Sequence, residues 1–383
     1  MRLMPNGVLI RAAISADADH IAELYRSAYD PGDGGRPEDH YPFPTLMQPG
    51  RLSRLLCEPD WLWSVAELSQ RIVAVIGARI GNLPCGGNAA FADLIGLVVG
   101  AEWRGQGIGQ QVARHLDREI FRTVDWALAE TRTAALGGWK IMARLEYPVV
   151  GLEPLCHRTP SGYEPMLLQA KMSAQRMTAR RTSTVCSQLA SFAQSVSAQF
   201  QVDKLIQGDR RTKTLASVQC PADVCTPKNG SATLAVPIRQ LPVILNDRIA
   251  GPSRLVEINV DRPGFVLRGY ADMVDRRLYI NSLTACDGTA SGDAVSVVLE
   301  EALGIAASRG LSSCVIDIRA DDGQLVDVLT RQEFKPTAYY PGLLCEEGYS
   351  LDAAQFTNMM AKPTVPSAPI TFDPNIFHMF GAM

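Results

Sequence analysis

The sequence predicts an α/β protein made of two consecutive units, and three observations predict it. Residues 1–171 alternate strand-like apolar runs with amphipathic helices. A length of 383 residues is more than one ordinary compact domain needs. A second series of strands and helices begins near Val236, after a change in composition. We therefore expect two folded units joined by a linker.

The first unit starts with a strand over residues 7–13 and a helix that Ser15 caps and that reaches Tyr29. Residues 31–49 are rich in Pro, Gly and Asp, so we expect a loop of the kind that often lines a site. The four-residue spacing of apolar side chains predicts one buried helix face, formed by Val112, Leu116, Ile120 and Val124. The other elements expected in this unit are a helix at 51–57, strands at 62–68, 71–80, 91–99 and 125–131, a helix at 134–145, and strands at 149–155 and 163–170.

The linker is expected to contain a connecting helix within residues 173–201 and a polar stretch over 208–230. The second unit then repeats the order of the first, with strands at 255–260, 265–272 and 277–283, a helix at 290–308, a strand at 311–318 and a helix at 323–330. Arg144–Gly151 and Thr330–Thr337 each end a helix and enter a strand behind an aromatic residue. This correspondence suggests a duplicated unit.

The composition excludes several classes of protein. A formal net charge of -3 shows no excess of basic residues of the kind that nucleic-acid binding needs. No apolar run reaches the roughly 18 residues that a membrane span needs, and the N-terminal residues lack the apolar core of a signal peptide. Nine scattered cysteines suit reduced thiols better than a disulfide framework. We expect a cytoplasmic protein without nucleic-acid or membrane partners.

The most informative motif is the run Arg104–Gly109, which lies between an apolar strand and an amphipathic helix. Glycines that open a helix present unpartnered backbone N–H groups, and the helix dipole adds positive potential, so phosphate is the expected ligand. The motif follows several strands and a helix, whereas a Rossmann turn follows the first strand. No Gly-Lys-Ser/Thr sequence is present for a P-loop.

The pattern Arg-x-x-Gly-x-Gly behind the strand that ends at Val99 resembles the pyrophosphate loop of the GCN5-related N-acetyltransferase (GNAT) superfamily. The resemblance covers residues 7–171 and implies a mixed, mostly antiparallel sheet flanked by helices. It also implies acetyl-CoA or another acyl-CoA as co-substrate, with no metal. The implied donor residues are Leu97, Val98 and Val99 along the pantetheine, and Arg104, Gly105, Gln106, Gly107, Ile108 and Gly109 around the pyrophosphate.

The second unit resembles a degenerate copy of this fold. The corresponding loop, Cys286–Asp293, lacks the arginine and the glycine spacing, and Asp287 and Asp293 would repel a pyrophosphate. We therefore expect one donor site per chain. The expected organisation is an acyltransferase domain at 1–171, a helical and loop-rich linker at 172–235, a degenerate GNAT-like domain at 236–362 and a tail at 363–383.

Acyl transfer from a thioester to an amine needs a base for the amine and an acid for the leaving thiolate. Asp93, on the strand at 91–99, is our candidate base, or else a solvated or salt-bridged acid at the strand end; Glu130 is a weaker candidate. In the resemblance, the place of the tyrosine that acts as the acid is occupied by Met142, so Tyr147 becomes the candidate acid and Tyr163 a further substitute. The alternative for each is an aromatic residue of the core or of the pocket wall. A Cys156–His157 nucleophile is disfavoured, because adjacent strand residues point to opposite faces.

The resemblance implies an acyl-CoA-dependent N-acyltransferase, of the acetyltransferase kind, that acts on an amine of a small molecule or peptide by direct attack in a ternary complex. Two alternatives remain: a non-catalytic acyl-CoA sensor or scaffold, and an acyltransferase that takes its acyl group from an acyl carrier protein. An aminoacyl-tRNA-dependent transferase is disfavoured by the intact loop. A homodimer is a further expectation that the sequence does not decide.

Overall fold

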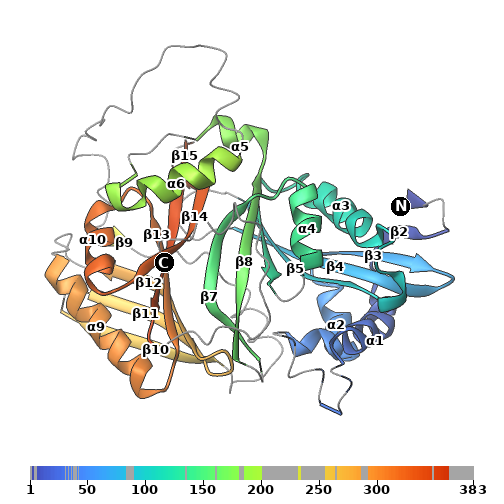
Figure 1. Ribbon diagram of the computed structural model, residues 1–383, viewed down its shortest axis with the longest axis horizontal. Helices are drawn as coiled ribbons and strands as arrows, with labels where there is room; N and C mark the ends of the chain where they lie inside the picture. The colour runs from blue at the N-terminus through green and yellow to red at the C-terminus, as the bar shows by residue number, and fades with distance from the viewer. Residues whose placement is uncertain are drawn as a thin grey trace.

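The protein is represented by a computed structural model that describes residues 2–3, 7–30, 32, 34–35, 37, 41, 43–82, 90–133, 136–159, 162–180, 185–200, 232–233, 255–263, 265–285, 292–346 and 349–361. Within these residues, helices cover an open sheet that runs through both halves of the chain (Figure 1). Most neighbouring strands are antiparallel, as expected.

The N-terminal half contains strands β1 to β8 in the order β1-β2-β3-β4-β5-β6-β8-β7. Their bounds are β1 Arg2–Leu3, β2 Leu9–Ala12, β3 Trp61–Leu68, β4 Arg71–Asn82, β5 Ala90–Val99, β6 Trp126–Arg132, β7 Val149–Thr159 and β8 Gly162–Met172. The helices of this half are η1 Ser15–Asp17, α1 Ala18–Tyr29, η3 Pro44–Met47, α2 Pro49–Leu55, η4 Ala101–Trp103, α3 Ile108–Ile120 and α4 Leu136–Arg144.

Alternating side chains of these strands face two separate cores. On one face, α3 buries Ile108, Val112, Leu116 and Ile120 against small and branched residues such as Ala74 and Ile76. On the other face, α1 and α2 pack against Trp61, Trp63 and Val75. The period of two along the strands explains why Val75 and Ile76 face opposite cores.

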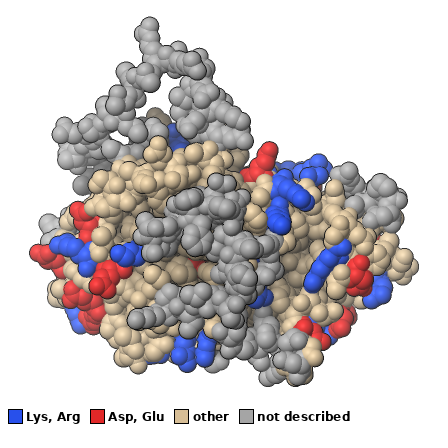
Figure 2. Space-filling model, viewed as in Figure 1, with Lys and Arg blue, Asp and Glu red and all other residues tan. Residues whose placement is uncertain are grey.

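Two helices connect the halves where we expected one. They are α5, Ala174–Thr178, and α6, Ser187–Gln199. Just after α5, Arg180 forms an isolated bridge to Ser350 and an ion pair with Asp352, so the chain is anchored to the C-terminal half at this point. The sequence of α6 contains no charged residue, and Figure 2 shows an uncharged surface over it, between ends where Lys, Arg, Asp and Glu are interspersed.

The C-terminal half repeats the strand order of the N-terminal half. Its strands are β9 Ala232–Thr233, β10 Leu255–Arg262, β11 Phe265–Asp272, β12 Arg277–Ala285, β13 Ser313–Arg319, β14 Lys335–Glu346 and β15 Tyr349–Met359, with helices α9 Gly292–Ser308 and α10 Gly323–Arg331. The order β10-β11-β12-β13-β15-β14 corresponds to β3-β4-β5-β6-β8-β7. The parallel pairs β5–β6 and β12–β13 occupy the same place in each series.

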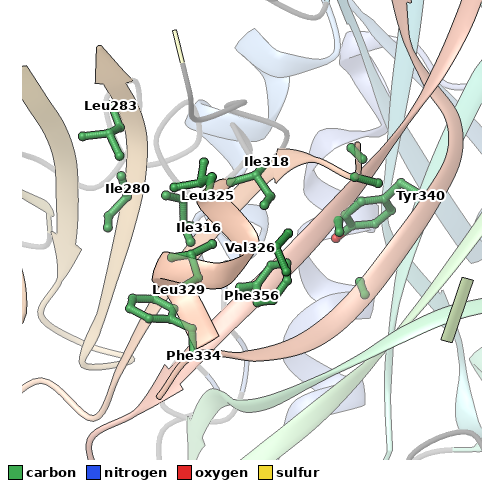
Figure 3. Packing of buried hydrophobic residues seen from close by; sticks show 14 of the residues in the cluster. Ile280, Leu283, Ile316, Ile318, Leu325, Val326, Leu329, Phe334, Tyr340 and Phe356 are labelled. Carbon is green, nitrogen blue, oxygen red and sulfur yellow. The ribbon is translucent and has the colours of Figure 1, made fainter. Parts of the chain in front are cut away.

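The C-terminal core lies between its helices and its strands. In Figure 3, Leu325, Val326 and Leu329 of α10 point toward Ile316 and Ile318 of β13. This core continues into the N-terminal half, because Phe91, Trp126 and Leu128 belong to the same buried cluster. Burial of this continuous apolar surface couples the two halves.

The strands of the two halves form one hydrogen-bonded path, whereas the sequence predicted two separate sheets. The junction is a single residue pair, Gly151 of β7 with Ala338 of β14. A Cβ at Gly151 would lie 2.4 Å from the Cβ of Ala338, so only glycine permits this approach. The central position of β7 and β8 in Figure 1 follows from this junction.

Candidate functional site

The glycine loop joins the end of β5 to the start of α3. Gly107 is the residue that precedes the helix and has φ 77°, and Gly105 has φ 79°. The space where a Cβ would lie is open at both glycines. In the described part of the chain, the amides of Gly105, Gln106 and Gly107 donate to no backbone carbonyl. The loop therefore offers exposed donors at a helix N-terminus, which is the arrangement that binds phosphate.

Side chains hold this loop against the strand. Nε of Arg104 donates to the carbonyl oxygen of Val99 at 3.1 Å, and Nε2 of Gln106 donates to the carbonyl oxygen of Glu102 at 3.1 Å. Gly109 lies against Val99, because a Cβ there would be 3.0 Å from the Val99 Cγ2 atom. The first turn of α3 is thus fixed beside the end of β5.

A bulge in β5 precedes the loop. The register of β4 and β5 shifts between Val75 and Gly77, and Gly96 has φ 66°. The hydroxyl of Tyr25 donates to the carbonyl oxygen of Gly96 at 2.5 Å. A Cβ at Gly96 would lie 2.1 Å from that hydroxyl oxygen, so glycine is required here.

Beyond the bulge, β5 separates from β6. The parallel pairs run from Phe91 with Trp126 to Leu94 with Ala129, and in the described chain the ladder does not continue to Leu97–Val99. On its other side, β5 remains paired with β4 through Val98 and Val99. One main-chain edge of Leu97–Val99 therefore has no strand partner in the described chain, and an extended ligand could pair with it as an additional strand.

A cavity of about 160 Å³ opens at this separation. Its N-terminal walls include Ile95, Gly96 and Leu97 of β5, and Glu130 and Arg132 of β6. Tyr29, Tyr41 and Phe43 close it from α1 and from the Pro- and Gly-rich loop, with the rings of Tyr29 and Tyr41 stacked at 4.4 Å. Burial raises the pKa of Tyr41 well above its usual value, so its hydroxyl is neutral.

The C-terminal half supplies the rest of the wall. Asp272 and Asp275, at the turn between β11 and β12, and Tyr279 of β12 line the same cavity. The buried guanidinium of Arg277 pairs with the carboxylate of Glu153 and donates to the hydroxyl of Tyr279 at 2.9 Å. The cavity is therefore built by both halves.

A bulge in β7 directs two further residues into the cavity. Glu153 pairs with Met166 and His157 with Glu164, so three residues of β7 lie opposite one residue of β8. Leu155 has φ 52° within this bulge. Cys156 and His157 consequently both line the cavity. The alternation argument against a shared face was wrong here, because the bulge breaks the alternation.

The thiol of Cys156 is nonetheless not poised to act as a nucleophile. Burial raises its pKa well above the usual value, and nearby carboxylates, Glu130 first among them, add to the shift. Nη1 of Arg277 donates to Sγ at 3.0 Å. A neutral buried thiol is a weak nucleophile. All cysteines in the described part of the chain are free.

The two predicted catalytic residues lie outside the cavity lining. Asp93 is 4% exposed within the part of β5 that is still paired with both neighbours, Arg79 and Leu128. Tyr147 is fully buried, and its hydroxyl donates to Asp117 at 3.0 Å, while Lys171 pairs with the other oxygen of Asp117 at 2.8 Å. Burial, followed by the charge of Asp117, raises the pKa of Tyr147 well above its usual value. This geometry favours structural roles for both residues.

Other sequence candidates separate in the same way. Glu130 and Met142 line the cavity. Tyr163 forms a hydrogen bond with Ser312 across the two halves, 2.5 Å between the oxygens. Of the second loop, residues 286–291 lie outside the described residues. Sequence reasoning missed Asp272, Asp275 and Tyr279, because no local pattern links them to residues in the N-terminal half.

Neither a membrane helix nor a metal cluster is found among the described residues. No helix there combines the length and hydropathy needed to cross a bilayer. No group of three or more His, Cys, Asp or Glu side chains there is arranged to hold a metal ion.

Residues 19–140 match the model of the acetyltransferase (GNAT) family. No curated protein sequence matches the chain.

Three solved structures illustrate the structural similarity. They are a ribosomal-protein-alanine N-acetyltransferase from Brucella melitensis (20% identity, TM-score 0.36), an acetyltransferase of the GNAT family from Streptococcus pneumoniae (14%, 0.36) and an N-acetyltransferase from Staphylococcus aureus (14%, 0.35). Each match covers 43% of this chain and 98% or 99% of the other chain.

Proposed function

We propose that the protein is an acyl-CoA-dependent N-acyltransferase that transfers its acyl group, acetyl in the first instance, to an amine by direct attack in a ternary complex. The observation that carries this proposal is the position of the glycine loop. Its free amides lie at the N-terminus of α3, directly after the separated edge of β5, and Leu97 of that edge lines the cavity. One extended ligand could occupy all three places.

In this proposal the donor runs from the loop into the cavity. The amides of Arg104–Gly109 bind the pyrophosphate, and the main chain of Leu97–Val99 pairs with the pantetheine. The thioester then lies near the bulge at Gly96, where backbone N–H groups stabilise the developing oxyanion. The acceptor enters the part of the cavity that Asp272, Asp275 and Tyr279 line.

We further propose that the chain is a tandem of one active and one degenerate GNAT-like domain, at 1–171 and 236–362. The repeated strand order and the matching parallel pairs support this organisation. The second domain then contributes acceptor-site walls, and the first alone binds the donor.

Isothermal titration calorimetry with acetyl-CoA tests the donor site. Gly107→Ala should weaken acetyl-CoA binding by about tenfold or more, because the added Cβ keeps the main chain away from the pyrophosphate. Longer acyl-CoAs, titrated in parallel, identify the preferred acyl chain.

Gly310→Ala is the matched control for this experiment. Gly310 also has positive φ, 66°, and open space where a Cβ would lie, but it follows α9 and is outside the site. Both variants should lose about 1–2 kcal/mol of stability from left-handed backbone strain. Equal acetyl-CoA affinity in wild type and Gly107→Ala would contradict the donor site.

The competing proposal is a non-catalytic acyl-CoA sensor, and Met142 favours it, because a thioether cannot protonate a leaving thiolate. Tight acetyl-CoA binding without thiol release across an amine panel would support the sensor. A donor carried by an acyl carrier protein is distinguished by transfer from acylated carrier protein but not from acyl-CoA.

A further inference from the structure

His157 is the cavity residue whose environment the proposed donor site does not explain. It is 4% exposed and lies in the β7 bulge. Its Nδ1 atom is 3.2 Å from Oδ1 of Asp275, which belongs to the turn between β11 and β12 in the other half of the chain. Its Nε2 atom is buried and has no hydrogen-bond partner among the described residues. Buried polar atoms usually have a hydrogen-bond partner, so a ligand bound in the cavity could supply the partner of this nitrogen.

The turn holds Asp275 in a fixed orientation. Oδ1 of Asp275 accepts the backbone N–H of Arg158 at 2.9 Å, and the amide of Asp275 donates to Oδ1 of Asp272 at 3.1 Å. A carboxylate oxygen cannot donate, so the proton of a neutral His157 ring is on Nδ1. The lone pair is then on Nε2, the ring nitrogen that has no partner among the described residues.

The groups around His157 are mostly acidic. Glu164 is opposite it on β8 but is paired with Arg132 at 2.6 Å. Asp272, Asp275 and Glu130 line the cavity, and Glu153 is paired with Arg277 beside Cys156. Together with the rings of Tyr29, Tyr41, Phe43 and Tyr279, this lining suits a small cationic amine with an apolar or aromatic body.

We propose that Nε2 of His157, positioned by Asp275, is the base that deprotonates a small primary amine acceptor in this cavity. The inference rests on the proposed acyl-transfer function and extends it by naming the acceptor class and the base. It also gives the C-terminal half a role in catalysis, since Asp275 is a positioning residue for the reaction.

The proton and electron balance of this step is complete. The acceptor enters as an ammonium ion and first loses one proton, through Nε2, to solvent. The neutral amine nitrogen then forms a bond to the thioester carbonyl carbon and loses a second proton to Nε2. The carbon–sulfur bond breaks, and the thiolate of CoA takes up one proton as the imidazolium returns to neutral imidazole. The products are the amide and the free thiol of CoA. His157 thereby supplies the proton that Met142 cannot.

Two measurements on the full chain test this proposal. With acetyl-CoA and a panel of phenylethylamine, tyramine, histamine and a short peptide, His157→Gln should lower kcat by about 10²- to 10⁴-fold. Its pH–rate profile should differ from that of the wild type, because the amide of glutamine cannot take up the proton of the amine. Long-range ¹H–¹⁵N spectra of histidine-labelled protein should show His157 as the Nδ1–H tautomer, and Asp275→Asn should disturb that tautomer and lower kcat.

His115→Gln is the matched control. His115 also forms a hydrogen bond through Nδ1, to Ser64 at 2.8 Å, but it lies on α3 outside this cavity. Acetyl-CoA affinity, from calorimetry, should be unchanged in all three variants, and His115→Gln should retain the wild-type rate and pH profile.

The outcomes separate the two proposals. Failure of the wild type to bind acetyl-CoA overturns the proposed function itself. If acetyl-CoA binds, an Nε2–H tautomer at His157 overturns the assignment of His157 as the base, whatever the acceptor is. A wild-type pH profile in His157→Gln also overturns it, and acetylation of the peptide alone overturns the acceptor class.

Discussion

At the residue scale, burial and partners separate groups that share the same chemistry. Tyr147 and His157 can both exchange protons, and both are almost fully buried. The hydroxyl of Tyr147 donates to Asp117, whereas His157 lines the cavity and its Nε2 atom has no partner among the described residues. A buried group that already has its partner contributes stability, and one that lacks a partner is available to a ligand.

Tyr147→Phe tests this distinction. The variant loses one hydrogen bond to Asp117, which Lys171 still neutralises, so the free energy of unfolding should fall by about 1 kcal/mol. Urea unfolding measures this change. The rate of thiol release from acetyl-CoA should remain at the wild-type value; a loss of about 10²-fold or more would make Tyr147 the general acid.

At the scale of elements, irregularities in strands create the site. The hydrogen-bonded pairing of β5 with β6 stops before the bulge at Gly96. The bulge at Leu155 lets both Cys156 and His157 line the cavity. The helices and strands themselves were predictable, because apolar periodicity is a local property of the sequence. The bulges were not, since they depend on which residues the neighbouring strands place opposite each other.

Gly96→Ala tests the first bulge. The added Cβ requires a left-handed backbone and collides with the hydroxyl of Tyr25, so the free energy of unfolding should fall by at least about 2 kcal/mol. Acetyl-CoA affinity should fall as well, because loss of the bulge would bring β5 closer to β6 at the place where the donor is proposed to bind.

The control for Gly96→Ala is Gly304→Ala, in the interior of α9, where a Cβ meets nothing within 4 Å. Alanine is the better helix former by up to about 1 kcal/mol, so this variant should be as stable as the wild type or more so. Chemical denaturation of both variants compares them directly. A Gly96→Ala protein of wild-type stability would show that the bulge is not required.

At the scale of the whole molecule, buried polar contacts join the two halves. Arg277 and Glu153 come from different halves, pair directly and are both 0% exposed. Trp126 donates from Nε1 to the carbonyl oxygen of Pro341 at 3.1 Å, and Arg180 pairs with Asp352 at 2.6 Å. Of these contacts, the Arg277–Glu153 pair joins β12 directly to β7, next to the β11–β12 turn.

Arg277→Met should lower the free energy of unfolding by about 3–5 kcal/mol, because it leaves the carboxylate of Glu153 buried without its cation. The double variant Glu153→Gln, Arg277→Met should lose less than the sum of the two single changes. Urea unfolding of the four proteins gives the coupling free energy. Additive losses would mean that the pair does not hold the halves together.

The sequence by itself determined the local features of this protein: the order of its helices and strands, and the glycine loop whose amides suit a pyrophosphate. These features depend on residues that are neighbours in the chain, so they can be predicted without a structure. The acceptor side depended on tertiary structure. Asp275 meets His157 only because β7 joins β14 at Gly151 and the Glu153–Arg277 pair brings the second half against the first. Contacts between residues so distant in the chain produce no periodic pattern in the sequence. Here they decide which buried side chains line the cavity.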